Sequence, residues 1–265
     1  SEDTEVLTET GWKNYKDVKS LKIAQYNRKN KKIEFLHHKG LYIYDYNGEM
    51  FHFKNDRIEI MVTPNHKMLI KREKSRVFEV ITAEKISSYR MQVANSGEYE
   101  GKTSKFFILP AIKHIQNRTH LKYIHQEKPN VIPFNLWLEF LGYYTTEGGL
   151  QRRATFGIPQ KKGIIAEKIK KCLVKLAKYL GFKLTETNEG EKYVRFQITN
   201  TQLFDYLEKN CRNNHLTKIL PLNFNHLSKK QLKILFEAMM IGDGASDKKS
   251  FTSTSKVLID QFHAI

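Results

Sequence analysis

The sequence predicts a chain in two parts, a β-rich N-terminal part followed by an α+β part. Short apolar runs separated by polar turns fill the first 110 residues, which is typical of a compact all-β unit. Beyond residue 131, long stretches with helical spacing alternate with short strand-like runs. The length of 265 residues is enough for two ordinary domains. We therefore expect one domain at residues 1–120 and a second at 131–265.

The N-terminal elements are predicted by short apolar and aromatic runs and, at residues 57–62, by alternation of apolar and polar residues. We expect extended segments at residues 22–26, 33–35, 41–44, 51–53 and 57–62. Polar turns at residues 27–31 and 54–56 separate neighbouring segments. Residues 95–104 and 117–130 are both polar, and we place the domain boundary in the second of these stretches.

The C-terminal elements follow in alternating order. We expect a helix at 136–146, a strand at 154–158 and an amphipathic helix at 164–180 that ends at Gly181. Residues 182–185 and 193–198 flank a polar turn and predict a hairpin. A helix at 201–208 begins after Asn200 or Thr199, and a last long helix runs from an N-cap at Ser228 to Met240.

Composition narrows the class of protein. Lys and Arg number 45 against 28 acidic residues, a net charge of +17, and such an excess favours a polyanionic partner, first of all nucleic acid. The aromatic and apolar content excludes a disordered chain. No run of 18 apolar residues and no signal-peptide core occur, so we expect no membrane association. The only cysteines, Cys172 and Cys211, support neither a disulfide framework nor a zinc site, which favours a reducing, cytoplasmic compartment.

Two of the expected helices end in the same way, 96 residues apart. Each has a small residue, a second small residue four positions later, then a carboxylate and a glycine. The first set is Gly142, Thr146, Glu147 and Gly148, and the second is Ala238, Gly242, Asp243 and Gly244.

Small residues at i and i+4 share a helix face and let two backbones approach closely. If these helices pack in parallel, Glu147 and Asp243 meet at the negative ends of two helix dipoles. A divalent cation, Mg²⁺ or a similar ion, would offset that charge, with Gly148 and Gly244 adjoining the metal. The pair is then a candidate two-metal centre for phosphodiester hydrolysis. The alternative is that both acids are ordinary helix-end residues, and their repetition argues against it.

Residues 140–148 and 236–244 resemble the motifs of LAGLIDADG homing endonucleases, with Glu147 in place of the commoner Asp. The resemblance implies an αββαββα fold, cleavage of double-stranded DNA, and Glu147 and Asp243 as its acids. Residues 218–221, Lys-Ile-Leu-Pro, look like a Lys-x-Ile-Pro segment of such inteins, which implies a catalytic role for Lys218. The alternative for Lys218 is a solvated surface lysine.

The same resemblance implies that sheet strands face the DNA, here residues 151–160 and 191–198. Their basic and amide side chains could contact phosphates or base edges. The candidates are Arg152, Arg153, Gln160, Lys161, Lys162, Lys192, Arg195 and Gln197.

Residues 3–12 resemble the opening of a Hint (hedgehog/intein) splicing domain, and residues 63–66 resemble its Thr-x-x-His motif. The resemblance covers roughly residues 1–110 and implies that Thr63 and His66 polarise the first scissile peptide bond. Ser1 is the candidate nucleophile, although it stands closer to Asp3 than is usual in the family. For His66 the alternative is a hydrogen-bonded histidine at a strand end.

Together these features predict an intein that carries a homing endonuclease and splices itself when intact. Its expected partners are double-stranded DNA and the flanking host protein (the extein), and we expect a monomer. Because only 22 residues follow Asp243, and a terminal His-Asn is missing, we expect the second endonuclease half to be incomplete and this chain by itself neither to splice nor to cut. Two alternatives remain open: a catalytically inactive DNA-binding protein of the same fold, and a Hint autoprocessing protein.

Overall fold

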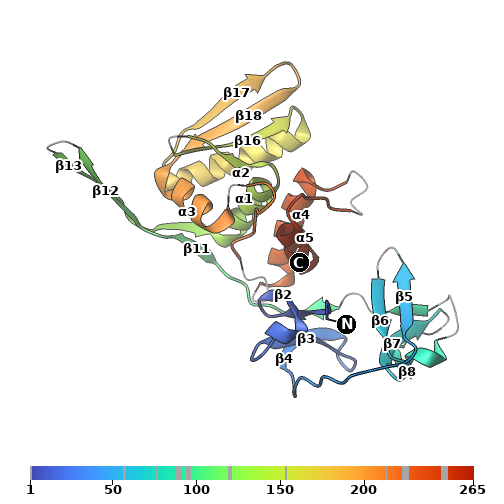
Figure 1. The fold of residues 1–265 in the computed structure, drawn as a ribbon. Coiled ribbons are helices and arrows are strands. Elements are labelled where there is room, and N and C mark those ends of the chain that lie inside the picture. The colour runs from blue at the N-terminus through green and yellow to red at the C-terminus, as the bar shows by residue number, and fades with distance from the viewer. Residues whose placement is uncertain are drawn as a thin grey trace. The chain divides into compact units, whose positions relative to one another are not determined.

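The structure is a computed structural model that forms two compact units, Ser1–Glu100 and Gly101–Ile265 (Figure 1). It describes residues 2–55, 58–73, 75, 77–86, 91–93, 97–118, 121–152, 154–212, 214–222, 227–245 and 250–265. The division between the units lies earlier than the expected break at 121–130. The polar stretch that we took for a linker contributes a β-hairpin to the second unit.

The first unit consists of strands and two short 3-10 helices. Its five-stranded sheet has the order β10-β4-β3-β1-β2. A two-stranded sheet (β5-β6) and a three-stranded sheet (β8-β7-β9) complete it. The bounds are β1 Glu5–Thr8, β2 Gly11–Asn14, β3 Lys22–Asn27, β4 Lys32–His37, β5 Phe51–Asn55, β6 Ile58–Val62, β7 Lys67–Arg72, β8 Glu79–Thr82, β9 Met91–Val93 and β10 Glu98–Tyr99, with 3-10 helices at Tyr15–Asp17 and Ala83–Lys85.

Four of the five extended segments expected in this unit are strands, and the fifth is not. Residues 41–44 form no strand, and Tyr42 and Tyr44 are 70% and 79% exposed. An apolar run becomes a strand only where a neighbouring strand accepts its backbone hydrogen bonds, and that condition cannot be read from alternation alone. The buried core of the β5–β9 region is small and centres on Met68, Ile70 and Ala83.

The second unit contains the element order helix, two strands, helix, two strands, helix. Its helices and antiparallel sheet, of order β15-β16-β18-β17, form the mixed α/β part of the chain. The bounds are α1 Phe134–Glu147, β15 Gly149–Leu150, β16 Thr155–Lys161, α2 Ile164–Leu180, β17 Leu184–Glu189, β18 Tyr193–Thr199 and α3 Thr201–Cys211. Before them come β11 Phe106–Leu109, β12 Ile112–Arg118, β13 Leu121–Glu127 and β14 Asn130–Pro133, and after them α4 Lys229–Gly242 and α5 Lys256–His263.

The expected helix ends of this unit are mostly confirmed. Asn200 caps α3, because its side-chain oxygen accepts a hydrogen bond from Leu203 N at 2.7 Å. Gly181 ends α2 in the left-handed conformation, with φ +65°. Ser228 occupies the N-cap position of α4 but its side chain makes no capping hydrogen bond. Helix α5 was not expected from the sequence.

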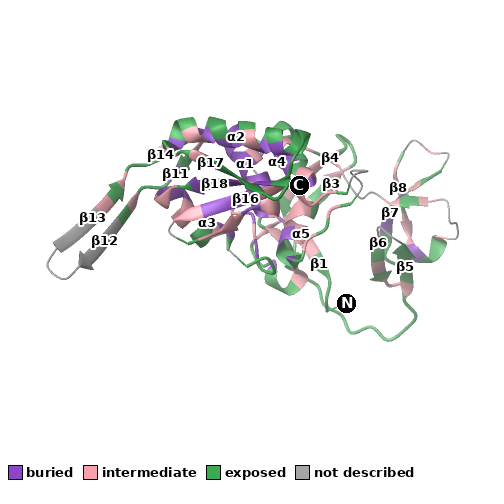
Figure 2. Ribbon diagram, turned by 90° about the horizontal axis from the view of Figure 1, so that it is seen from above, coloured by how far each residue is buried: buried purple, intermediate pink, exposed green. Residues whose placement is uncertain are grey.

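The core of the second unit lies where the helices cover one face of the sheet. Phe156, Ile158, Phe196 and Ile198 turn inward from β16 and β18 and are almost completely buried. Helix α1 is buried on nearly all sides, as the purple colouring of Figure 2 shows. This burial fixes the position of the C-terminal end of α1. No helix in the described ranges is long and apolar enough to span a membrane.

Candidate active site

Helices α1 and α4 pack against each other through their small residues. A β-carbon added at Gly142 would overlap that of Ala238, and one added at Gly242 would overlap the side chain of Thr146. Such a close approach is possible only because both positions lack a side chain. The partners in each contact are 96 residues apart in sequence.

A hydrogen bond at the N-terminal end of the two helices also joins residues that are 96 positions apart in the sequence. Gln231 Nε2 donates to Asn135 Oδ1 at 2.9 Å. Contacts with one constant offset, from the first turns of the helices to their last, mean that α1 and α4 run parallel and in register. The structure thus brings the two repeated segments together as the sequence predicts.

The two repeated acids lie at the adjoining C-terminal ends of this pair. Glu147 is the last residue of α1, and its Cγ lies 3.2 Å from the point where a Gly242 β-carbon would be. Burial raises the pKa of Glu147, whereas a hydrogen bond from Gln160 and the charge of Lys218 lower it. Burial and the charge of Glu147 raise the pKa of Asp243 to about 6. The protein therefore only partly offsets the energetic cost of holding each of these carboxylates in its charged form.

Lys218 completes the cluster. It is 8% exposed, so it is not the solvated surface lysine of the alternative interpretation. Its ammonium group donates to the carbonyl of Gly148 and lies 5.1 Å from the centre of the Tyr144 ring. Burial lowers the pKa of Lys218 to about 8, although the charges of Asp243 and Glu147 oppose that shift. The cluster thus holds two carboxylates and one buried amine.

Helix α5 and the end of α3 hold the backbone around Lys218. Ser255 Oγ donates to the Lys218 carbonyl at 2.8 Å and also caps α5 by accepting from Leu258 N. Gln261 exchanges two hydrogen bonds, both 2.8 Å, with the backbone of Leu220. This support was not expected from the sequence, because α5 is amphipathic but only eight residues long.

Gln160 lies in this cluster and not on the open face of the sheet. Its amide donates to Glu147 Oε1 at 3.5 Å. Alternation along β16 puts Gln160 in phase with the buried Phe156 and Ile158. Contact of Gln160 with DNA stays a prediction.

The two repeated glycines serve close packing at the helix ends. A β-carbon on Gly148 would overlap the Tyr144 side chain, and one on Gly244 would overlap the Met240 carbonyl. Both glycines therefore let the chain turn back over the preceding helical turn. The contribution of Tyr144, whose ring lies beside Lys218, was not anticipated from the sequence.

The donor set fits a small divalent cation. In the described part of the chain no group of three or more His, Cys, Asp or Glu side chains could hold a metal. Glu147 and Asp243 nevertheless supply oxygen ligands only, and Mg²⁺ typically binds one or two carboxylates together with water and substrate oxygens. Burial raises the pKa of both carboxyls, and a bound cation would favour their charged forms.

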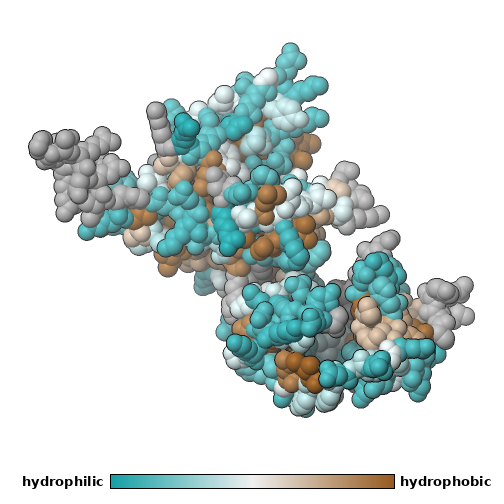
Figure 3. All heavy atoms as spheres, viewed as in Figure 1, coloured by the Kyte–Doolittle hydropathy of each residue, from teal (hydrophilic) through white to brown (hydrophobic). Residues whose placement is uncertain are grey.

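The open face of the sheet carries several of the predicted contact residues. Arg195 and Gln197 of β18 lie opposite Pro159 and Gly157 of β16, in the register that faces away from the core. Gln197 donates to Gln151 Oε1 at 3.2 Å, and Arg195 pairs with Glu189. The β17–β18 region appears mostly hydrophilic in Figure 3.

The remaining predicted contact residues lie at the ends of these strands. Lys161 ends β16, and Lys162 N donates to the Lys192 carbonyl at 2.9 Å where β16 and β18 meet. These three lysines and Arg152 are exposed. Arg153 lies outside the described residues.

In the first unit, Thr63 and His66 belong to one tight turn between β6 and β7. His66 N donates to the Thr63 carbonyl at 3.0 Å, and Thr63 Oγ1 donates to Asn65 Oδ1 at 2.7 Å. Backbone hydrogen bonds from Ala83 and Glu84 hold the turn, and the His66 side chain is exposed. The candidate nucleophile Ser1 lies outside the described residues.

Comparison with known proteins finds relatives but no family. No protein-family model matches the chain. It is 27% identical over 259 residues to a protein of Chlamydomonas moewusii described as ATP-dependent Clp protease proteolytic subunit, covering 91% of this chain and 24% of the relative. It is 24% identical over 257 residues to the DNA-directed RNA polymerase subunit beta C-terminal section of Stigeoclonium helveticum, covering 90% of this chain and 22% of that protein.

The chain thus spans about a quarter of the length of the curated relatives that it matches. The two relatives bear the names of unrelated proteins, yet each contains a stretch similar to nearly all of this chain. A stretch shared in this way between different host proteins is typical of a mobile inserted element.

Proposed function

We propose that the second unit is a DNA endonuclease that hydrolyses phosphodiester bonds in both strands of a specific duplex. The observation that supports this most is the in-register α1–α4 pair, which places Glu147 and Asp243 at one end beside the buried Lys218. An ordinary structural core would gain nothing from two mutually repelling carboxylates there, because each raises the energy of the charged form of the other.

In this proposal Glu147 and Asp243 hold one or two divalent cations, Mg²⁺ being the expected ion. When bound, such ions activate water and stabilise the leaving oxygen of a phosphodiester. The chain's own contribution is to fix the two carboxylates on rigid helix ends and to place the Lys218 amine beside them. An ammonium group there stabilises negative charge that develops on the phosphate. Arg195, Gln197 and the exposed lysines of the sheet would position the duplex.

We further propose that the chain is an intein-type element, in which the first unit excises the insertion from its host protein. The support is the occurrence of similar stretches in proteins with different names. A translated insertion must leave its host if the host is to function. Thr63 and His66, held in one turn, would then polarise the first scissile peptide, with Ser1 as the nucleophile and the flanking host protein as substrate.

The endonuclease is tested by incubating genomic DNA from the source organism with the purified full-length protein that contains this chain and sequencing the new double-strand ends. We expect breaks at one or few sites with Mg²⁺ and none with EDTA. Glu147→Gln and Asp243→Asn should abolish cleavage. Glu237→Gln, which changes an exposed carboxylate of α4, is the matched control and should cleave normally. Cleavage that survives either active-site change, or no cleavage by the unaltered full-length protein, overturns the proposal. Sequence-specific binding without cleavage would instead favour an inactive DNA-binding protein.

A further inference from the structure

Lys218 lies in a segment that belongs to no helix or strand. Residues 218–222 have no regular secondary structure, so neither a helix axis nor a sheet register fixes the Lys218 backbone. The side chain is nevertheless almost completely buried, and its ammonium group donates to the carbonyl of Gly148. The end of α3 supplies one contact to the segment, because Ile219 N donates to the Cys211 carbonyl at 3.0 Å. Its position therefore depends on contacts from other elements.

Two side chains of the α5 region supply three more hydrogen bonds to the backbone of this segment. Ser255 is completely buried, and its hydroxyl donates to the Lys218 carbonyl at 2.8 Å and accepts from Leu258 N at 3.3 Å. Gln261 bonds both the N–H and the carbonyl of Leu220, each at 2.8 Å. One hydroxyl thus caps α5 and holds Lys218, so the position of the helix and that of the lysine are coupled.

Helix α5 is in turn tied to the helix that carries the second acid. The Phe262 ring stacks on Phe236 of α4, with ring centres 5.1 Å apart, and on Phe251, with ring centres 4.0 Å apart. Aromatic pairs stabilise a contact beyond the area that they bury. Next to Phe251, Thr252 N donates to the Asp243 carbonyl at 3.2 Å. These contacts hold α5 in place relative to the end of α4, where Asp243 lies.

We propose that α5 fixes the Lys218 segment relative to α4, and that Ser255 and Gln261 are positioning residues that hold the Lys218 ammonium beside the two carboxylates. The proposal rests on the endonuclease function proposed above and deepens it. A charged group stabilises developing charge best when it is held in place before the reaction. Loss of the contacts from Ser255 or Gln261 should therefore slow cleavage through Lys218. The Kd for DNA should stay nearly unchanged, because neither side chain is among the predicted DNA contacts.

The first test measures how accessible Lys218 is in the absence of DNA. The full-length protein that contains this chain is labelled briefly by reductive methylation, and the labelled lysines are identified by mass spectrometry. We expect little label on Lys218 in the unaltered protein. Gln261→Met keeps the length of the side chain and removes both hydrogen bonds, so it should raise the labelling of Lys218 several-fold, and Ser255→Ala should act in the same direction. The exposed Lys192 is the internal standard and should be labelled equally in all variants.

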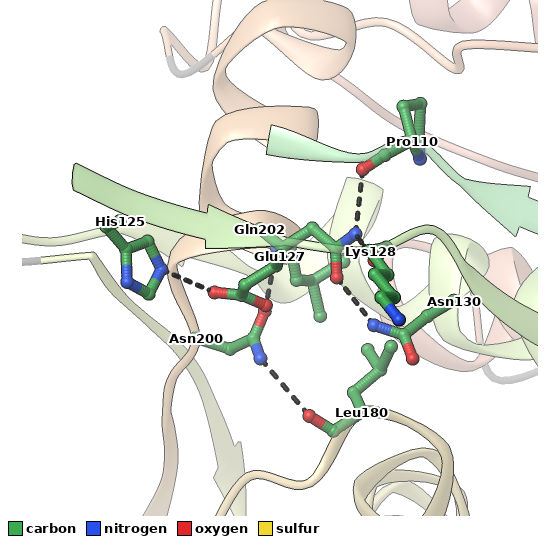
Figure 4. Close-up of polar contacts among 9 residues, drawn as sticks. Pro110, His125, Glu127, Lys128, Asn130, Leu180, Asn200 and Gln202 are labelled. Atoms are coloured by element: carbon green, nitrogen blue, oxygen red, sulfur yellow. Dashed lines mark hydrogen bonds and ion pairs between the residues drawn. The ribbon is translucent and has the colours of Figure 1, made fainter. Parts of the chain in front are cut away.

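The matched control is a second hydrogen-bonded glutamine of the same unit, Gln202 of α3 (Figure 4). It is almost completely buried, its Nε2 donates to the carbonyls of Pro110 at 2.7 Å and Lys128 at 2.9 Å, and its Oε1 accepts from Asn130 Nδ2 at 2.7 Å. None of these three partners belongs to α5 or to the Lys218 segment. Gln202→Met should therefore lower the free energy of unfolding at least as much as Gln261→Met but leave the labelling of Lys218 unchanged.

The second test is a double-mutant cycle on the single-turnover cleavage rate of the duplex mapped in the cleavage experiment. Gln261→Met should lower this rate by about 10-fold, within the roughly 10²-fold that a displacement of about 1 Å can cost. In a Lys218→Met background, Gln261→Met should change the rate by less than about twofold, because the group that it positions is gone. A merely structural role of Gln261 would lower the rate by the same factor in both backgrounds.

The outcomes separate this proposal from the function on which it rests. If Gln261→Met and Gln202→Met raise the labelling of Lys218 equally, or neither raises it, the proposal is overturned whether or not the protein cuts DNA. Equal rate losses from Gln261→Met with and without Lys218 would also overturn it, while the endonuclease stands. If the unaltered full-length protein cuts no duplex, the endonuclease fails, and the catalytic role of this arrangement fails with it.

Discussion

Replacing Asp243 by Asn should stabilise the metal-free protein above neutral pH. Burial and the charge of Glu147 raise the pKa of Asp243 from 3.8 to about 6. A raised carboxyl pKa means that the folded state holds the proton more tightly than the unfolded state does. The associated stability is therefore fully present below pH 3.8 and is lost as the pH rises through 6. Asparagine keeps the shape of the side chain and removes the charge.

The size of the effect follows from that shift. A rise in the pKa of Asp243 from 3.8 to about 6 corresponds to a loss of roughly 3 kcal/mol of folding stability at a pH where this carboxyl is ionised in both the folded and the unfolded state. Asp243 is only half-buried, and solvent screening reduces the value, so we expect about 1–2 kcal/mol at pH 8. For a domain of this size, 1 kcal/mol moves Tm by roughly 2–4 °C. The Asp243→Asn protein should thus melt a few degrees above the unaltered chain in EDTA at pH 8.

Thermal unfolding at pH 8 and pH 4, with EDTA and with Mg²⁺, measures this directly. The difference between the two proteins should be small at pH 4, where the carboxyl is protonated in the folded state. Mg²⁺ at 100 times its Kd should stabilise the unaltered chain by about 2.7 kcal/mol and should stabilise the Asp243→Asn protein far less. Metal binding would then explain why the protein keeps an acidic pair that lowers its folding stability when no metal is bound.

The control is Glu237→Gln, an exposed carboxylate near the end of the same helix, which should change stability by less than about 0.5 kcal/mol under all conditions. The reasoning is refuted if Asp243→Asn melts below the unaltered chain in EDTA at pH 8. It is also refuted if Mg²⁺ raises the Tm of both proteins equally.

Three further changes test the helix pair, a cap and the buried amine. Gly142→Ala should lower the free energy of unfolding in urea by about 1–3 kcal/mol, because its new methyl group overlaps that of Ala238. Adding Ala238→Gly should restore most of this stability. No restoration would argue against the in-register contact. Asn200→Ala should cost about 1 kcal/mol and Asn200→Asp much less, since aspartate keeps the acceptor for Leu203 N. Lys218→Met should lower the single-turnover cleavage rate by about 10²- to 10³-fold while the Kd for DNA stays nearly constant. A loss of DNA affinity as large as the loss of cleavage rate would assign Lys218 to DNA contact.

The parallel helix pair was predictable because its determinants are local. Small residues four positions apart, a carboxylate and a glycine, repeated at one interval, define both the contact face and the ends that meet. The helices and strands of the second unit follow from apolar spacing for the same reason. A pattern repeated at one interval limits the packing far more than a single motif does.

Other features depend on contacts that sequence spacing does not encode. The backbone around Lys218 is held by Ser255 and Gln261, which come from the start and the middle of α5, a helix of only eight residues. The polar residues 117–130, which favour a domain boundary in the sequence, instead include strand β13. Residues 41–44 show the opposite case, since they are an apolar and aromatic run like a strand but form none in this structure.

The repeat is symmetric in its backbone but not in its electrostatics, and that difference bears on how the two acids would work. Glu147 receives a hydrogen bond from Gln160 and lies near Lys218, and both lower its pKa against the effect of burial. At Asp243 burial and the charge of Glu147 raise the pKa, while the charge of Lys218 lowers it. Burial thus raises the pKa of both carboxyls, and a bound cation would favour the ionised form of each. The repeated motif brings the two acids together, whereas the hydrogen bond to Glu147 comes from Gln160 on a strand and not from the motif.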